Sequence, residues 1–435
     1  MSDSDVATAV GGALGGIAGG RLQALPFTLR FWDGSTLAGE SPTPVTVVRS
    51  PKALAYLLRA PNQIGLARAW VTGVLDVEGD LGAVLAARNR FNGIALSAAD
   101  RLKLVAAALR AAPSVLVQPA PIPGIEAAPR GRRHSLARDR TAVRHHYDVS
   151  NNFYRLLLGP SMTYSCAYFE TPQTTLEEAQ ERKHELICRK LRLVPGERLL
   201  DIGCGWGSLL LHAASRHAAR CVGVTLSESQ AQLARKRVRE QGLSDLVEIR
   251  IADYREISDG PFDKIASVGM YEHVGLAELG RYAQAVAALL RPGGLFLNHG
   301  IARLASEQSA PDTFINRYIF PDGELHPVTE IQRAMQRAGF EVRDVESLRE
   351  HYPLTLRRWH ANLEDNRARA VELVGEERER AWRLYLLASA HGFEDADITV
   401  YQVLGARLGS DHRLPLDRVE LIAPDRLEAT QPSSD

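Results

Sequence analysis

From residue 197 onward, short apolar runs alternate with amphipathic stretches. Runs such as 197–203 and 295–301 show little alternation of polar and apolar side chains, whereas stretches such as 208–217 and 229–242 repeat apolar residues every three or four positions. Strands buried on both faces and joined by helices are typical of a doubly wound, mainly parallel α/β sheet. The predicted strands are 197–203, 220–226, 246–254, 262–270, 295–301 and 398–407, and a further helix ending at glycine is predicted at 280–294.

The N-terminal part predicts a smaller α+β domain. Asp33-Gly34 separates two extended runs and indicates a hairpin, and it is followed by a predicted strand at 42–50 and a predicted helix at 51–60. Ser97 is a suitable cap for another helix, at 97–112. One face of that helix carries Leu102, Val105, Ala106 and Leu109. We expect this apolar face in the core, with lipid contact or dimerisation as the alternative.

A proline-rich passage at 112–133 resists both helix and sheet pairing and marks the predicted domain boundary. The predicted organisation is an N-terminal domain for lipid binding or dimerisation at 21–112, a Pro- and Arg-rich linker at 113–140, the α/β domain at 141–423 and a mobile tail at 424–435.

Charge excludes a general attraction to nucleic acid. The chain has 52 basic and 52 acidic residues, and its formal net charge is zero. One local exception runs from Arg130 to His146, which holds six arginines, three histidines and a single aspartate. Two interpretations of this run stay open, namely a solvated linker and a contact with an anionic lipid surface, where each basic group adds about 1 kcal/mol.

The four cysteines are Cys166, Cys188, Cys204 and Cys221. They form no C-x-x-C pair, and the chain opens with the acidic sequence MSDSD, so we expect free thiols in a reducing cytoplasm. We expect no membrane-spanning segment, because no run approaches the roughly 20 apolar residues that one needs. The cysteines and histidines also lack the spacing of metal ligands, and we expect no metal site.

Gly203, Gly205 and Gly207 lie in the predicted turn between the first strand and its helix. Their spacing is not the G-x-G-x-x-G of dinucleotide sites, and the second strand ends in Val224-Thr225 rather than in an acid that would hold ribose hydroxyls. The pattern therefore favours S-adenosylmethionine over NAD. Asp253 and Tyr254 close the third strand, where a carboxylate and an aromatic ring suit an adenine nucleoside.

Seven motifs, in order, resemble the cyclopropane fatty acid synthase family, including the mycolic acid cyclopropane synthases: HYDVSNNFY, YSCAYF, LLDIGCGWG, GVTLSESQ, GMYEHVG, YIFPDGEL and HYPLTLRRW. The resemblance covers Thr141 to about Arg407, and the N-terminal part resembles the extra domain of full-length members that act on phospholipids. It implies a Rossmann-like class I methyltransferase. The cofactor contacts that it implies are Tyr164, Ser165, Gly203, Cys204, Gly205, Thr225, Leu226, Gln230, Asp253 and Tyr254.

The resemblance also implies the chemistry: methyl transfer from S-adenosylmethionine to the cis double bond of an unsaturated phospholipid acyl chain, with closure to a cyclopropane ring. A bicarbonate ion would act as general base, held by Glu272, His299, Tyr352 and the backbone amides of Cys166 and Ile301. From the residues alone, Glu272 is the plain candidate for the base. Aromatic faces would tolerate the cation, with Tyr168, Phe169, Tyr318 and Phe320 as candidates.

One departure from many cyclopropane-forming relatives keeps the product open. This chain has Gly300 after His299 and Ala302 after Ile301, where those relatives have threonine and glycine. A differently shaped pocket allows an alternative product, a methylene-branched chain. Amine N-methylation and a silent lipid-binding protein are further alternatives. We expect a homodimer that associates peripherally with the inner face of the membrane.

Overall fold

The computed structural model describes residues 5–15, 25–87, 97–116, 120–127, 131, 133, 138, 150–304 and 313–422. Backbone contacts divide the chain into two units, the first made of Met1–Pro129, Ala310–Pro321 and Trp359–Gly392, and the second of Arg130–Ser309, Asp322–Arg358 and Phe393–Asp435. The first unit thus takes in two segments of the predicted 141–423 domain. The predicted tail, residues 21–24 and most of the basic run lie outside the described residues.

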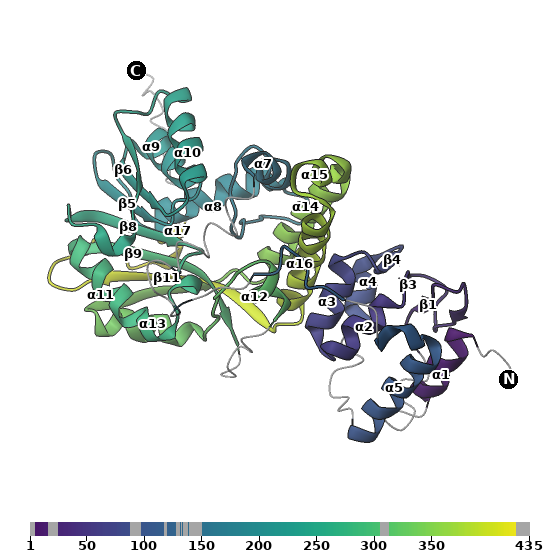
Figure 1. Cartoon of the computed structure of the whole chain (residues 1–435). Coiled ribbons are helices and arrows are strands. Elements are labelled where there is room, and N and C mark those ends of the chain that lie inside the picture. The colour runs from purple at the N-terminus through teal and green to yellow at the C-terminus, as the bar shows by residue number, and fades with distance from the viewer. Residues whose placement is uncertain are drawn as a thin grey trace, which may run out of the picture. The chain divides into compact units, whose positions relative to one another are not determined.

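The second unit contains a seven-stranded sheet of order β10-β11-β9-β8-β5-β6-β7 (Figure 1). Its strands are β5 (Arg198–Ile202), β6 (Arg220–Thr225), β7 (Val247–Ile251), β8 (Phe262–Val268), β9 (Leu290–Arg303), β10 (Phe340–Ser347) and β11 (Ile398–Arg407). Neighbouring strands from β9 to β7 are parallel, whereas β11 is antiparallel to both β9 and β10. The predicted doubly wound, mainly parallel sheet is confirmed.

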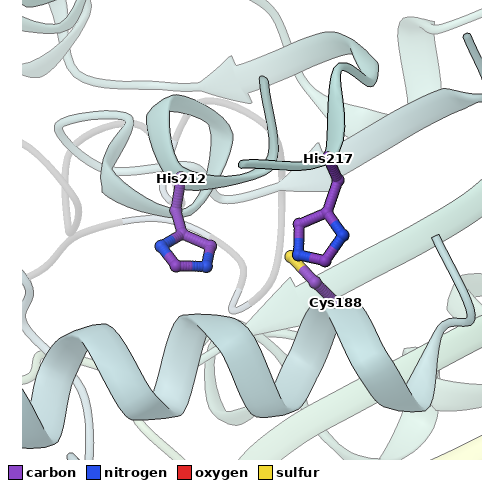
Figure 2. Close-up of side chains that lie close together, drawn as sticks. All are labelled: Cys188, His212 and His217. Carbon is purple, nitrogen blue, oxygen red and sulfur yellow. The ribbon is translucent and has the colours of Figure 1, made fainter. Parts of the chain in front are cut away.

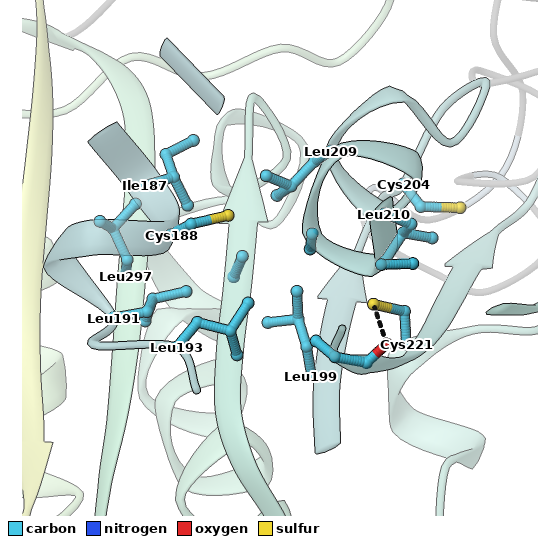
Figure 3. Packing of buried hydrophobic residues seen from close by; sticks show 14 of the residues in the cluster. Ile187, Cys188, Leu191, Leu193, Leu199, Cys204, Leu209, Leu210, Cys221 and Leu297 are labelled. Carbon is cyan, nitrogen blue, oxygen red and sulfur yellow. Dashed lines mark hydrogen bonds between the residues drawn. The ribbon is translucent and has the colours of Figure 1, made fainter. Parts of the chain in front are cut away.

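Successive side chains of a strand point to opposite faces of the sheet, so both faces of these apolar strands need cover. Helices provide it on each face. Leu199 belongs to the core on one face and Leu200 to the core on the other. Figure 3 shows the first core, where Leu191 and Leu209 pack near Leu199. This face is covered by α8 (Leu176–Lys190), α9 (Ser208–His217), α10 (Glu228–Glu240) and α17 (Arg418–Ile422), and the opposite face by α11 (Leu279–Leu289) and α13 (Val328–Arg337). The short helix α7 (Asn151–Leu158) precedes them.

Two details of the second unit differ from the sequence prediction. The predicted helix at 280–294 ends earlier, at Leu289, and Gly293 and Gly294 lie inside β9. Strand β10 was not predicted, because a register shift between Val342 and Asp344 interrupts the alternation of its apolar residues and three residues are acidic in FEVRDVES. It pairs only with β11, and a strand with one neighbour tolerates such polar residues.

The first unit contains a four-stranded sheet of order β2-β1-β3-β4. Its strands are β1 (Thr28–Arg30), β2 (Thr36–Leu37), β3 (Val45–Val48) and β4 (Leu75–Glu78), and its N-terminal helices are α1 (Val6–Gly15), α2 (Lys52–Arg59), α3 (Gln63–Val71), α4 (Leu81–Ala86) and α5 (Ala98–Ala111). The predicted hairpin at Asp33-Gly34, the strand and both helices are confirmed.

Later segments of the chain join this first unit. They comprise α12 (Phe314–Tyr318), the C-terminal part of α14 (His351–Asp365), α15 (Arg367–Val374) and most of α16 (Glu376–Glu394). Arg380 is almost fully buried and donates to the carbonyl of Trp70 (2.6 Å), while the Trp70 indole donates to the carbonyl of Arg380 (2.8 Å). The guanidinium also lies over the Trp70 ring. These reciprocal contacts fix α16 against α3.

The predicted buried face of α5 is wrong. Ser97 caps the helix as expected, through a capping box with Asp100. However, Leu102 is 70% exposed and Val105 is 37% exposed. The helix instead buries the small side chains of Ala107 and Ala108. Periodicity alone could not identify the face that packs on the rest of the unit, because alanines suit close helix packing as well as leucines do.

None of the described helices has the length and apolar character that crossing a membrane requires.

Candidate active site

The glycine-rich loop joins β5 to α9 at the carboxyl end of the sheet. Gly203, Gly205 and Gly207 all have positive φ (82°, 54° and 80°), which other residues adopt only with strain. The N–H groups of Gly203 and Cys204 donate to the carbonyl of Val224 at 3.0 and 2.9 Å, so the loop is tied to β6. Cys204 and Trp206 between the glycines are buried, so the loop forms a cradle in which the glycines present bare backbone at the edge where ligands bind in such sheets.

The predicted contacts at the ends of β6 and β7 are ordered by hydrogen bonds. Buried Thr225 donates through Oγ1 to Gln230 Oε1 (2.8 Å), which holds the Gln230 side chain at the start of α10. Leu226 follows Thr225 directly. The carboxylate of Asp253 is bound by the Arg255 guanidinium through two contacts of 2.7 Å.

Tyr254 lies next to this carboxylate in the sequence. Its ring packs edge-on against Tyr282, with ring centroids 5.4 Å apart. The Asp253-Tyr254 corner is thus fixed in place, and its contact with an adenosyl group stays a prediction.

The segment Tyr164-Ser165-Cys166 is held by α8. Gln180 Nε2 donates to the carbonyl of Ser165 (2.9 Å) and Lys183 Nζ donates to Ser165 Oγ (2.7 Å). Cys166 is fully buried, and its Sγ lies 3.8 Å from the carbonyl oxygen of Leu348. Burial raises the pKa of the Cys166 thiol well above its usual range, so a reactive thiolate is disfavoured.

Sequence reasoning missed Lys183, which lies beneath this segment. Burial lowers its pKa to about 7 and raises the pKa of Asp201, in β5, to about 7, while the opposite charges of the two groups partly offset these shifts. Perturbed groups of this kind cluster at functional sites. The signal available in the sequence was a lysine inside an apolar helical face of α8.

Glu272 lies in a 3₁₀ turn, Tyr271–His273, after β8. Its Oε1 accepts the N–H of Ile301 at 2.7 Å, and its Oε2 is buried without a hydrogen-bond partner among the described residues. Burial raises the pKa of Glu272 to about 7, although the Ile301 amide works in the opposite direction. A carboxyl group with such a pKa exchanges a proton readily near neutral pH.

His299 lies in β9, opposite Val268, the last residue of β8. The Gln402 side-chain amide lies 3.2 Å from His299 Nδ1. With that amide as the donor, the proton of a neutral imidazole is assigned to Nε2, and burial keeps the pKa of His299 well below its usual value. Within the described part of the chain Nε2 has no partner either. Gln402 was not predicted from the sequence.

The backbone amide of Ile301 has a partner within the protein. Its N–H was expected to bind an anion, but it donates to Glu272, while its carbonyl accepts the Tyr271 hydroxyl at 2.7 Å. The Glu272 side chain reaches β9 directly and therefore accepts the hydrogen bond of this amide. Ile301 therefore orients Glu272 in this structure.

Backbone contacts bring the predicted base residues into one neighbourhood. Ile301 pairs with Val400, whose carbonyl accepts the N–H of Leu348 at 2.9 Å. Leu348 in turn neighbours Cys166. Tyr352 follows in the first turn of α14, where its buried ring packs on Phe393 at 4.5 Å between centroids. The contact of Tyr352 with an anion stays a prediction.

Gly300 provides space for Tyr271. A Cβ built on Gly300 would lie 2.0 Å from Tyr271 Cε1 and 3.4 Å from the Glu272 carboxyl carbon. The glycine that departs from the resembling family is thus matched by a tyrosine ring in this chain. Sequence reasoning noted Gly300 but not its partner, because the two positions are far apart in the chain.

The aromatic candidates for cation contact have partners of their own. Tyr168 stacks on His351 with centroids 4.7 Å apart, and Phe169 is buried. In the first unit, Tyr318 donates to Glu126 (2.8 Å) and Phe320 packs edge-on against a neighbouring tyrosine. Contact of any of these rings with a substrate cation stays a prediction.

The pKa of Glu272 predicts a pH-dependent stability difference. Because the pKa is higher in the folded state than the ordinary 4.5, this group stabilises the fold at low pH and its contribution is lost as pH rises through about 7. Urea unfolding of the wild type and Glu272→Gln at about pH 5 and about pH 8.5 should therefore show that the variant gains stability relative to the wild type at the higher pH. An unchanged difference would refute this environment for Glu272.

Comparisons with known proteins agree with this geometry. The family model described as "Mycolic acid cyclopropane synthetase" matches residues 134–403. A "Probable fatty acid methyltransferase" of Pseudomonas putida is 40% identical over 405 residues, which is 91% of this chain and 96% of that protein. The cyclopropane-fatty-acyl-phospholipid synthase of Escherichia coli K12 is 38% identical over 262 residues, 60% of this chain and 66% of its own.

Among solved structures, the mycolic acid cyclopropane synthase CmaA1 complexed with SAH and CTAB has a TM-score of 0.59 and 35% sequence identity, covering 62% of this chain and 98% of its own. This likeness confirms the Rossmann-like class I methyltransferase fold, and the glycine cradle fits the same cofactor. The chain therefore belongs to the mycolic acid cyclopropane synthetase family and is an S-adenosylmethionine-dependent methyltransferase of the cyclopropane synthase type.

Proposed function

We propose that this enzyme methylates the cis double bond of unsaturated acyl chains in phospholipids and closes a cyclopropane ring. The observation that carries the proposal is the pair of buried polar atoms, Glu272 Oε2 and His299 Nε2, that lack partners among the described residues. Buried polar groups are nearly always paired, so this pair favours a polar ligand beside the methyl-transfer site.

The reaction has two chemical requirements. S-adenosylmethionine, when bound, supplies an electrophilic methyl group. The alkene π electrons form the new carbon–carbon bond to that methyl group as the carbon–sulfur bond breaks, which leaves a carbocation on the acyl chain. Loss of a proton from the added methyl group then lets its electron pair close the ring. A site for this reaction needs a base in an otherwise apolar pocket.

Glu272 and His299 suit that need when a bicarbonate ion supplies the base. Glu272 accepts the hydroxyl of the ion, and His299 donates from Nε2 to a charged oxygen. Hydrogen bonds to a charged group each contribute about 1.5 to 3 kcal/mol. Tyr352 and the Cys166 amide would complete the set, whereas the Ile301 amide holds Glu272 in place. Gln402 keeps the imidazole oriented for donation.

Access to acyl chains requires docking at a membrane surface, and α5 suits it. The exposed Leu102 and Val105 are accompanied by Lys103 and Arg110. Leu102, Lys103 and Arg110 line a groove of about 650 Å³ between α1 and α5. Apolar side chains flanked by cations favour an anionic phospholipid surface. We include peripheral binding at the inner face of the membrane, as a homodimer, in the proposal.

This docking surface can be tested by replacing Leu102 with serine. Leu102 would be buried in lipid when the protein is docked. Its loss should therefore weaken binding to anionic phospholipid vesicles about tenfold, measured by co-sedimentation. Leu416→Ser, at another exposed leucine in the second unit, is the matched control and should bind like the wild type. Equal binding by all three proteins would argue against α5 as the docking element.

The function itself is tested by incubating the enzyme with methyl-labelled S-adenosylmethionine and vesicles of a cis-monounsaturated phospholipid. Proton NMR of the extracted lipid should show the methylene of a cyclopropane ring. Vinylidene protons instead would establish the methylene-branched product. Absence of label in lipid across several head groups would overturn the proposal and leave a lipid-binding role.

A further inference from the structure

A cluster of metal-ligand side chains lies between α8 and α9, and the catalytic proposal does not use it. The ligand atoms of Cys188, His212 and His217 lie within 4.8 Å of one another. Figure 2 shows His212 and His217 projecting from α9 toward α8, with the His217 ring beside the Cys188 sulfur. The sequence analysis missed this cluster because Cys188 is distant in the chain from the two histidines.

A carboxylate is placed beside the two imidazoles. Glu185 Oε2 lies 2.9 Å from His212 Nε2 and 3.1 Å from His217 Nε2. Its other oxygen, Oε1, accepts from Arg189 Nε at 2.7 Å. Glu185 and Cys188 are one helical turn apart on α8, so their side chains point to the same side. The carboxylate oxygen thus contacts both imidazoles, and the thiol on α8 lies near the two imidazoles.

We propose that Cys188, His212 and His217 bind a Zn²⁺ ion that joins α8 to α9, with the neighbouring carboxylate of Glu185 available as the fourth ligand. Four ligands drawn from cysteine, histidine and carboxylate are the usual set for tetrahedral zinc, whereas Mg²⁺ and Ca²⁺ prefer oxygen alone. Cys188 is fully buried, and the His212 and His217 side chains are largely so. A largely buried cysteine and histidine set of this kind is typical of a structural rather than a catalytic zinc site.

The position of the cluster indicates what a bound ion would stabilise. Helix α9 starts directly after the glycine cradle, and α8 carries Gln180 and Lys183, which hold the Ser165 segment. A metal bound by both helices would fix these two walls of the cofactor site to each other. Such an ion would stabilise the fold, whichever lipid product the enzyme forms.

The alternative is a metal-free cluster, in which protons shared with Glu185 satisfy both histidines. The two cases differ in metal content. The full-length wild type, stripped with a chelator and reloaded with Zn²⁺, should retain about one zinc per chain after desalting, measured by plasma mass spectrometry. Zinc should also raise the melting temperature of the stripped protein, and Mg²⁺ should not.

Substitutions then locate the ion. His212→Ala and His217→Ala should lose at least about 90% of the retained zinc, since loss of one ligand weakens such sites strongly. The matched control His412→Ala, at a histidine elsewhere in the second unit, should keep it. For Cys188, whose substitution disturbs the core, the wild type loaded with Co²⁺ should show a thiolate-to-metal absorption band. Zinc retention that is absent in the wild type, or unchanged in both histidine variants, would overturn the proposal.

Discussion

Replacing Gly300 with alanine will destabilise the protein and slow its turnover. The added Cβ would lie 2.0 Å from Tyr271 Cε1, a distance that no pair of non-bonded carbons tolerates. Tyr271 cannot move away easily, because it is almost fully buried and its hydroxyl donates to the carbonyl of Ile301. Overpacking of this kind costs about 1 to 3 kcal/mol in the free energy of unfolding. Because Glu272 follows Tyr271, displacement of the ring also moves the carboxyl group, and we expect turnover to fall at least about tenfold.

A matched control and a double variant isolate the cause. Gly280, in α11, has no atom within 4 Å of a built Cβ, so Gly280→Ala should change the free energy of unfolding by less than about 1 kcal/mol. In a Tyr271→Ala background the Gly300→Ala substitution should cost less, with a coupling of roughly 1 to 3 kcal/mol. Urea unfolding measures the wild type, the three single variants and the double variant. Additive effects would show that the ring does not determine the need for glycine.

Replacing Glu272 with glutamine will reduce turnover by roughly a hundred- to ten-thousandfold, because the general base that Glu272 would hold usually contributes that much. Glutamine retains an oxygen that can accept the Ile301 N–H, so the fold should persist. It also directs an N–H₂ group, a donor, toward the space where Oε2 now provides an acceptor. Steady-state rates with labelled S-adenosylmethionine and saturating phospholipid measure the loss.

Cys166→Ser is the comparison variant, because Cys166 is expected to act through its backbone amide. Its thiol lies near the carbonyl oxygens of Ala167 and Leu348, and burial holds the pKa of the thiol high. Turnover should stay within about tenfold of the wild type. If Cys166→Ser were inactive and Glu272→Gln active, the assignment of roles to these two residues would be wrong.

The sheet of the second unit could be predicted because its strands are buried on both faces. The run at 197–203 has no polar alternation, and it forms β5 in the centre of the sheet. Strand β10, at the edge, was missed because a register shift between Val342 and Asp344 interrupts the alternation of its apolar residues. The exposed face of α5 was also missed, since periodicity identifies an apolar face but not what it contacts.

Some residues of the candidate site could be predicted from the sequence and others could not. Glu272 and the glycine loop were predicted because side chains after parallel strands gather at one edge of the sheet. His299 came from the resemblance. Gln402 and Lys183 reach the site from segments that the local pattern marks only as strand and helix. The pairing of Gly300 with Tyr271 depends on atomic packing between β9 and the turn after β8, which no spacing in the chain expresses.

The most direct test of the account is the bicarbonate dependence of turnover. Wild-type enzyme would be assayed with labelled S-adenosylmethionine and cis-monounsaturated phospholipid in buffer freed of carbon dioxide, and again after bicarbonate is added. The account predicts a loss of at least about tenfold in the depleted buffer and full recovery on addition, because Glu272 and His299 hold an anion that accepts the proton. A rate in depleted buffer equal to that with added bicarbonate would contradict it.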